Sequence, residues 1–353
     1  MFSNRRPNCV LMAAAALLAT ASPALALSSA EAEAFEAEIS LAKSNMMGQS
    51  ATALKHARKA RSLVASESVK AKKARLTAKW LEAEALMRMN RAGEAAPILD
   101  HAASETAKHF DGSKLHADLL RSQGSLNARK GDFAVALPAF TKAQGLYAEL
   151  GEARSQAIVL LNIGSLYSGA REFETALGYF RQGHEAFPED PALGLSAHNN
   201  MGNALKGLGR YAEAEAAFAK ALTLAKQKPS AMLEARILTN IASVQSLGGN
   251  VAGAQETAAT AMAIAKEHAP NWARFIDGVL AQIELSKGNA DQAETHLNRA
   301  FDGEDLTKTA AHFREFHETA VELYSALGRE AKLQQHRAAI ARLNAQVAKL
   351  PKA

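Results

Sequence analysis

A serine and a lysine near the start of the chain have the spacing of a nucleophile and its base. Ser40-Leu41-Ala42-Lys43 matches the Ser-x-x-Lys motif of serine acyl-enzymes, in which the lysine amine sits beside the serine hydroxyl. Those enzymes also carry Ser-Asp-Asn and Lys-Thr-Gly motifs, and neither accompanies this pair. The surrounding pattern predicts the interior of a helix, so we interpret the match as coincidence and expect no catalytic residues.

Histidines and glycines offer two further patterns, and both are weak. His312 and His317 are five residues apart, which places their rings on different faces of a helix, unlike the i, i+4 pair of zinc proteases. Gly202, Gly207 and Gly209 resemble a phosphate-binding loop only loosely, because no strand precedes them. We therefore expect no metal site and no cofactor.

The first 26 residues have the pattern of an export signal. Arg5 and Arg6 precede an apolar run, and Pro23 is followed by the small-x-small site at residues 24–26. The apolar run is too short to span a bilayer, so cleavage is favoured over an anchor. The residues after the two arginines do not fit the twin-arginine signal, so ordinary export of an unfolded chain is expected. The mature protein would then occupy residues 27–353.

Cleavage would also change the composition. The full chain has 41 Lys plus Arg against 36 Asp plus Glu, and a single cysteine. Without Arg5, Arg6 and Cys9, 39 basic residues remain against 36 acidic ones, and the mature chain has no cysteine. This excludes a disulfide framework, a thiolate metal site and a cysteine nucleophile. The apolar content of 48% excludes general disorder.

Internal repetition dominates the mature sequence. The clearest unit reads Leu160-Leu161-Asn162-Ile163-Gly164-Ser165-Leu166-Tyr167 and continues to Phe173, Ala176 and Phe180. The same register, moved along the chain, finds eight units that begin at residues 34, 76, 117, 157, 195, 235, 274 and 314. Position 20 is alanine in seven of them, from Ala53 to Ala293, and position 27 is nearly always small. Small residues recur where two helices approach closely.

Glycine or asparagine occupies position 15 of most units, with Arg171 as the exception, and such residues allow the left-handed backbone that ends a helix. Each unit therefore reads as a first helix of about 14 residues and a somewhat longer second helix. No segment alternates with period two. The amphipathic stretch from 330 to 350 reads as a helix capping the last pair, or alternatively as a helix for a partner or for self-association.

These units resemble tetratricopeptide repeats, in the longer subclass of about 40 residues found in kinesin light chains and bacterial peptide-responsive regulators. The resemblance implies an all-α fold, a right-handed α-solenoid of about eight helix pairs with a C-terminal capping helix. It also implies that the first helix of each pair lines a concave groove, where positions 2, 5, 6, 9, 12 and 13 contact the partner. In the central units these positions supply Asn162, Ser165, Asn199, Asn200, Asn203, Lys206, Arg236, Thr239, Asn240 and Ser243.

Asparagine recurs at position 6, in Asn162, Asn200 and Asn240. A side-chain amide both donates and accepts, which suits an extended peptide backbone. Stacked helices roughly 8 to 10 Å apart would present these amides at intervals of about three residues of such a peptide. We therefore expect the three to form one ligand-holding row. The alternative, that they satisfy backbone groups of loops or neighbouring helices, stays open.

The expected function is that of a noncatalytic, exported scaffold that binds a peptide or protein partner, in the periplasm or secreted, in the assembly or maintenance of the cell envelope. A peptide-sensing regulatory protein is the alternative. Two basic stretches, 56–61 and 70–75, read as solvated helix faces, or as a weak contact with an acidic partner or an anionic surface. Nucleic acid is not expected as a partner of an exported chain with so small an excess of positive charge.

Overall fold

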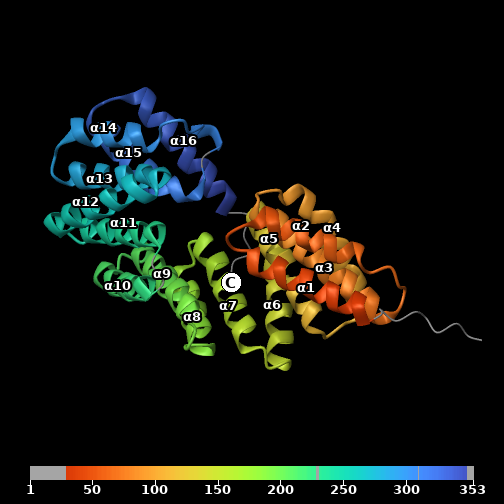
Figure 1. Ribbon diagram of the computed structural model, residues 1–353. Coiled ribbons are helices and arrows are strands. Elements are labelled where there is room, and N and C mark those ends of the chain that lie inside the picture. The colour runs from red at the N-terminus through yellow and green to blue at the C-terminus, as the bar shows by residue number, and fades with distance from the viewer. Residues whose placement is uncertain (1–28, 228–229, 309, 348–353) are drawn as a thin grey trace, which may run out of the picture. The chain divides into compact units, whose positions relative to one another are not determined.

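Helices form almost all of the ordered elements in the computed structural model, which describes residues 29–227, 230–308 and 310–347 (Figure 1). No strand occurs among these residues. The α-helices are α1 (Ser29–Asn45), α2 (Ser50–Ser62), α3 (Val69–Arg88), α4 (Ala92–His109), α5 (Lys114–Lys130), α6 (Phe133–Glu149), α7 (Ala153–Gly169), α8 (Phe173–Ala186), α9 (Pro191–Gly207), α10 (Tyr211–Gln227), α11 (Ala231–Leu247), α12 (Val251–His268), α13 (Ala273–Ser286), α14 (Ala290–Ala300), α15 (Arg314–Ala326) and α16 (Glu330–Val347). Three 3₁₀ turns, η1 (Pro270–Trp272), η2 (Leu306–Lys308) and η3 (Ala311–Phe313), lie between the later helices.

The contacts divide the chain into two compact units, with the boundary inside α3 between Ala85 and Leu86. In the first unit, α1 packs against α2. Its first basic stretch is partly neutralised internally, because Lys59 pairs with Glu38 at 2.6 Å and Arg58 pairs with the buried Glu82 at 2.9 Å. The predicted leader, residues 1–26, lies outside the described residues.

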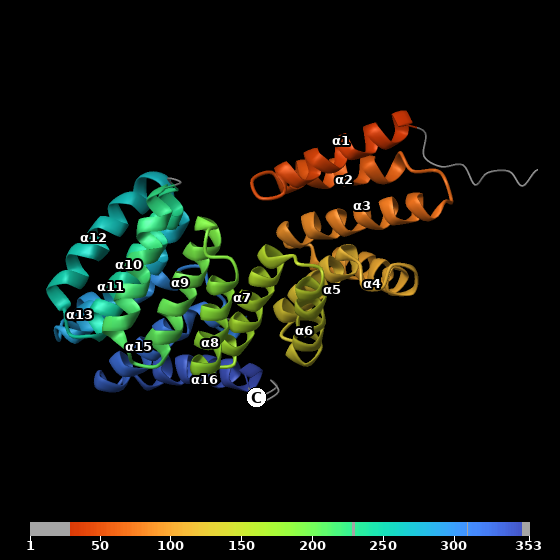
Figure 2. The ribbon, with the colours of Figure 1, turned by 90° about the horizontal axis from the view of Figure 1, so that it is seen from below.

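The second unit is a solenoid in which α5 to α16 form successive antiparallel pairs. Each first helix packs on its own second helix and on the following pair, so neighbours in the chain are neighbours in space. Figure 2 shows α8, α9 and α10 side by side. The predicted all-helical solenoid is confirmed. Its last helix, α16, is the second helix of the eighth unit and packs on α15. Among the described residues, no helix combines the length and the apolar character that a membrane span requires.

Position 17 of every predicted unit is the first residue of its second helix, from Ser50 in α2 to Glu330 in α16. The first helices mostly begin a few residues earlier than expected, and α5, α7, α9 and α11 each have 17 residues rather than about 14. Side chains that cap these early starts explain part of the difference. The carboxylate of Asp190 accepts the N–H groups of Ala192 and Leu193, so α9 begins at Pro191.

Small residues bring the two helices of a pair together. The alanines of positions 20 and 27 are fully buried, from Ala53 to Ala300. In three consecutive pairs a glycine of the first helix lies under an aromatic ring of the second. A Cβ atom on Gly202 would lie 2.6 Å from the ring of Phe218, so this glycine is required by packing. Gly124 and Gly164 meet Phe140 and Phe180 in the same way.

The turn after each first helix uses a left-handed residue. Gly131, Gly209, Gly249, Gly288 and Gly328 have positive φ, as does Asn90. Gly48 is not among the positive-φ residues, so the first unit departs from the expectation. Arg171 adopts φ +64 although it has a full side chain. The C-terminal residues of these turns bring position 17 of each second helix close to the groove described next.

Candidate partner-binding groove

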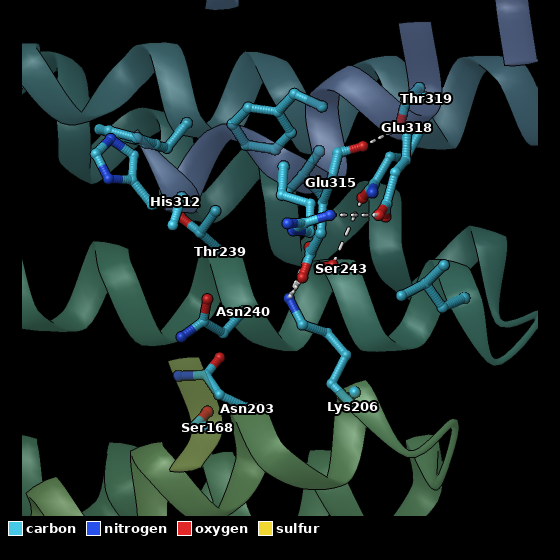
Figure 3. Close-up of a pocket in the computed structure, with 18 of the residues that line it drawn as sticks. Ser168, Asn203, Lys206, Thr239, Asn240, Ser243, His312, Glu315, Glu318 and Thr319 are labelled. Atoms are coloured by element: carbon cyan, nitrogen blue, oxygen red, sulfur yellow. Dashed lines mark hydrogen bonds and ion pairs between the residues drawn. The ribbon is translucent and has the colours of Figure 1, made fainter. Parts of the chain in front are cut away.

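First helices of the second unit line a single large groove. The cavity has a volume of about 1020 Å³, and its walls come from α7, α9, α11, α13 and α15, with η1, η3 and the starts of α8 and α10 at its edges. In Figure 3, Lys206 rises from α9 toward Glu315 on α15, while His312 lies at the other end of the view. The groove is thus enclosed by helices that lie far apart in the sequence.

The lining residues fall on the repeat positions that the resemblance implied. In α11 these are Arg236, Thr239, Asn240 and Ser243, at positions 2, 5, 6 and 9. In α15 the same positions hold Glu315, Glu318, Thr319 and Glu322. One face of an α-helix repeats every three to four residues, so these positions all point to one side.

Seven of the ten residues predicted for the groove line it. They are Asn199, Asn203, Lys206, Arg236, Thr239, Asn240 and Ser243. The other three, Asn162, Ser165 and Asn200, are not part of its lining. Ser165 is exposed and donates its hydroxyl to the carbonyl of Leu161, one turn earlier in α7.

The predicted row of Asn162, Asn200 and Asn240 therefore does not run along this cavity, because only Asn240 lines it. The groove crosses the stack obliquely. It meets α7 at Ser168 and Gly169, positions 12 and 13, but meets α11 mainly at positions 2 to 9. A fixed repeat position does not follow such a path.

Amide groups on α9 and α11 are linked to one another. The Asn240 amide donates to the Asn199 side-chain oxygen at 3.2 Å, and Asn199 donates to the Asn200 oxygen at 3.4 Å. Part of the hydrogen-bonding capacity is thus used within the protein, as the structural alternative requires. The amide of Asn203 has no hydrogen-bond partner among the residues that the structure describes, so it is available to a ligand.

Charged residues gather where α7, α9 and α15 approach. The Lys206 amine lies 2.7 Å from one carboxylate oxygen of Glu315 and 2.8 Å from the other. Arg314 lies 4.0 Å from Glu318 and donates to the side-chain oxygen of Asn344 at 2.8 Å. Burial, together with the nearby charge of Arg171, lowers the pKa of Arg314. Positive charge is therefore concentrated at this end.

Aromatic residues form the other end. Trp272 stacks on Phe275, with ring centroids 4.3 Å apart, and its indole N–H donates to the Thr239 hydroxyl at 3.0 Å. The guanidinium of Arg236 lies 5.3 Å from the Trp272 ring centre, a cation–π contact. The ring of His312 packs on Phe275 at 5.4 Å. This end offers flat apolar surfaces beside a cation.

Our sequence reasoning missed Phe275, Gln282 and the α15 residues, because it read the groove positions in three central units only. The same positions counted in the units beginning at 274 and 314 identify them. Trp272 and Arg171 lie outside those positions, in a 3₁₀ turn and at a helix end, and no repeat rule points to them.

The residues first considered for chemistry lie apart. Ser40 and Lys43 are both exposed on α1. His312 lines the groove, whereas His317 is fully buried and bonded to His336. Gly207 lies under the Phe173 ring and Gly209 takes a positive φ, so packing and turn geometry account for both. Within the described residues, no group of three or more His, Cys, Asp or Glu side chains is arranged to hold a metal ion.

Comparisons with known proteins point in one direction. A family model described as tetratricopeptide repeat matches residues 195–267, which cover most of α9 to α12. A Drosophila melanogaster protein named O-mannosyl-transferase Tmtc3 is 39% identical over 80 residues, which are 22% of this chain and only 8% of that relative.

Similar solved structures extend over much more of the chain. The apo form of the quorum sensor NprR from B. thuringiensis has a TM-score of 0.67 at 12% identity, covering 88% of this chain and 87% of NprR. A Rap protein complexed with competence and sporulation factor has a TM-score of 0.62 at 14% identity, covering 90% of this chain and 99% of the Rap protein. At such identities the likeness concerns the fold.

Proposed function

We propose that this tetratricopeptide-repeat protein is a noncatalytic, exported scaffold that holds an extended peptide segment, free or within a protein partner, in the groove between α7 and α15. The observation that carries the proposal is the groove itself, whose floor on α9 and α11 presents amides and hydroxyls from Asn203, Asn240 and Ser243. Such groups match the alternating donors and acceptors of an extended backbone. A structural neighbour, the Rap protein, was solved in complex with competence and sporulation factor.

The volume and character of the groove support a peptide rather than a small metabolite. A cavity of about 1020 Å³ lies at the upper end of the usual range for small-molecule sites, and charged residues take up one end. An aromatic end and a polar floor fit a chain that carries side chains of several kinds. The role in the cell envelope and the periplasmic location rest on the leader pattern of residues 1–26 and belong to the same proposal.

The test compares two amide variants. The full chain is immobilised and incubated with a peptide pool made by proteolysis of an envelope extract. The double variant Asn203→Ala, Asn240→Ala removes two groove amides, and Gln292→Ala, Asn298→Ala removes two exposed amides from α14 as a matched control. Each lost hydrogen bond should weaken binding by about 0.5 to 1.5 kcal/mol, so the groove variant should bind about 5- to 150-fold more weakly.

The control should bind as the wild type does. Full retention of the same peptides by a correctly folded groove variant would remove these amides from the binding site. Failure of the wild type to retain any peptide would contradict the proposed function as a whole. Helicity and unfolding of each variant are recorded in the same buffer.

A peptide-sensing regulator is the second candidate, and one observation favours it. The ion pair between Lys206 and Glu315 joins the fifth repeat to the eighth across the groove. A ligand that enters there has to displace or rearrange this pair, and the solenoid could then change its pitch. Small-angle scattering with and without a retained peptide distinguishes the two candidates, because a rigid scaffold keeps its radius of gyration.

A further inference from the structure

Arg171 occupies a position that does not suit its backbone. It follows α7 at position 15 of its unit, with φ +64, where the corresponding residues with positive φ are Asn90 and five glycines. A residue with a long side chain rarely adopts this conformation, because its Cβ lies too close to backbone atoms. A strained residue of this kind is a reason to ask what its side chain does.

The side chain lines the groove and is accessible. Arg171 is exposed, and its guanidinium lies 5.4 Å from the ring centre of Phe173. Among the described residues it has no carboxylate within ion-pair distance. Other cations nearby are paired: Lys206 with Glu315, and Arg210 with Glu213 at 2.6 Å.

The lining as a whole carries an excess of positive charge. Its cations are Arg171, Lys206, Arg236 and Arg314, and its anions are Glu315, Glu318 and Glu322. Four against three leaves one uncompensated charge. Glu315 is held by Lys206, and Glu318 faces Arg314, so the group that lacks an anion at this end is Arg171. Its planar guanidinium can donate two parallel hydrogen bonds to one carboxylate.

We propose that Arg171 is the specificity-determining residue of the groove and binds a carboxylate of the extended peptide. The inference rests on the proposed function and adds the chemical class of the ligand to it. Binding is expected to favour peptides with an Asp or Glu side chain or, if the carboxylate is that of the last residue, peptides with a free C-terminus. Stacking on Phe173 holds the guanidinium in place for this contact.

The experiment uses pools of random heptapeptides passed over the immobilised full chain. One pool has amidated C-termini and the other has free C-termini, and the retained peptides are sequenced. With the wild type, Asp and Glu should be enriched roughly threefold or more in the amidated pool if a side chain is bound. If the terminal carboxylate is bound, the free-acid pool should be retained in preference without that enrichment.

Variants of Arg171 assign the preference. Arg171→Gln should abolish it and Arg171→Lys should keep part of it, because a lysine retains the charge without the fork geometry. Arg210→Gln is the matched control, since Arg210 stands in the next inter-helix turn but outside the groove lining. This control should select peptides as the wild type does.

Arg171→Gly separates the function of the residue from its structure. Glycine relieves the strain of the positive φ and loses backbone entropy on folding, two effects of similar size, so the unfolding temperature should stay near that of the wild type. Peptides should still be retained, without the acidic preference. Retention without any preference in the wild type, or a preference unchanged in Arg171→Gln, overturns the inference but leaves the proposed function. Absence of retention overturns both.

Discussion

Lys206 on α9 and Glu315 on α15 form an ion pair at 2.7 Å although 109 positions separate them in the chain. The Lys206 side chain is 11% exposed and that of Glu315 is 39% exposed. The contact exists because three helix pairs turn the solenoid far enough for the first helices of the fifth and eighth units to face each other. It therefore reports on the curvature of this part of the fold.

Glu315→Gln is expected to destabilise the second unit. It leaves the nearly buried Lys206 amine with a neutral partner, and a charge-assisted hydrogen bond of this kind contributes about 1.5 to 3 kcal/mol. The partial exposure of Glu315 reduces this, so about 1 to 2 kcal/mol is expected. Urea unfolding measures the change, with Lys206→Met and the double variant completing a cycle. Additive effects of the two substitutions would show that the pair has no coupling energy.

Overpacking of the alanine ridge is a second prediction. Ala214 is fully buried at position 20 of its unit, between α9 and α10. Ala214→Leu adds three carbon atoms where the helices approach most closely, and should lower the free energy of unfolding by about 1 to 3 kcal/mol. Ala219→Leu, on the exposed face of the same helix, is the matched control. Equal thermal unfolding of the two variants would contradict the assigned packing role.

The glycine that lies under an aromatic ring gives a third prediction. A Cβ on Gly202 meets three ring atoms of Phe218 within 2.7 Å, so Gly202→Ala has to displace the ring or separate α9 from α10. We expect a loss of about 1 to 3 kcal/mol. Adding Phe218→Leu to this variant makes room for the new methyl group. The double variant should then lose less than the sum of the single changes; strict additivity in chemical unfolding would argue against the contact.

The repeat pattern predicted the fold well, because packing imposes the same residue type at the same position in every unit. The alanines at position 20 and the starts of the second helices follow directly from it. The path of the groove could not be predicted in this way. It depends on the small rotation between successive pairs, which accumulates until Glu315 meets Lys206, and no single repeat encodes that sum.

Export is a fourth prediction, and it concerns residues outside the described part of the chain. The sequence predicts cleavage after Ala26, so the mature protein should begin at Leu27 and appear in the fraction released by osmotic shock. N-terminal sequencing of that fraction is the measurement. A product that retains Arg5 and Arg6 and stays in the cytoplasm would contradict the proposed location, while leaving the groove and its ligand untouched.

The buried histidine pair of the last repeat gives the fifth prediction. His317 on α15 is fully buried and His336 on α16 is 5% exposed, and their Nδ1 atoms are 2.7 Å apart. One neutral ring therefore donates and the other accepts. Burial, with the charge of a protonated His336, lowers the pKa of His317 to about 4. Burial, with the charge of Lys332, lowers the pKa of His336 to about 4.

These lowered pKa values make stability depend on pH in a defined direction. In the unfolded chain both imidazoles have a pKa near 6.5, so between about pH 6.5 and 4 the unfolded state binds more protons than the folded state. The contribution of the pair is complete above pH 6.5 and is lost as the pH falls toward 4. The limiting slope is about 1.4 kcal/mol per pH unit for each imidazole.

Urea unfolding at pH 7 and at pH 5 measures this effect. The double variant His317→Asn, His336→Gln keeps hydrogen-bonding side chains at both positions but cannot titrate there, so its stability should fall less between the two pH values than that of the wild type. His109→Gln, which removes an exposed imidazole, is the control for histidine loss elsewhere. The acidic side chains whose pKa values are lowered, such as Glu284 and Glu294, act mainly below pH 4.5 and are common to all three proteins. An equal loss of stability in the double variant and the wild type would show that the pair is not neutral in the folded protein.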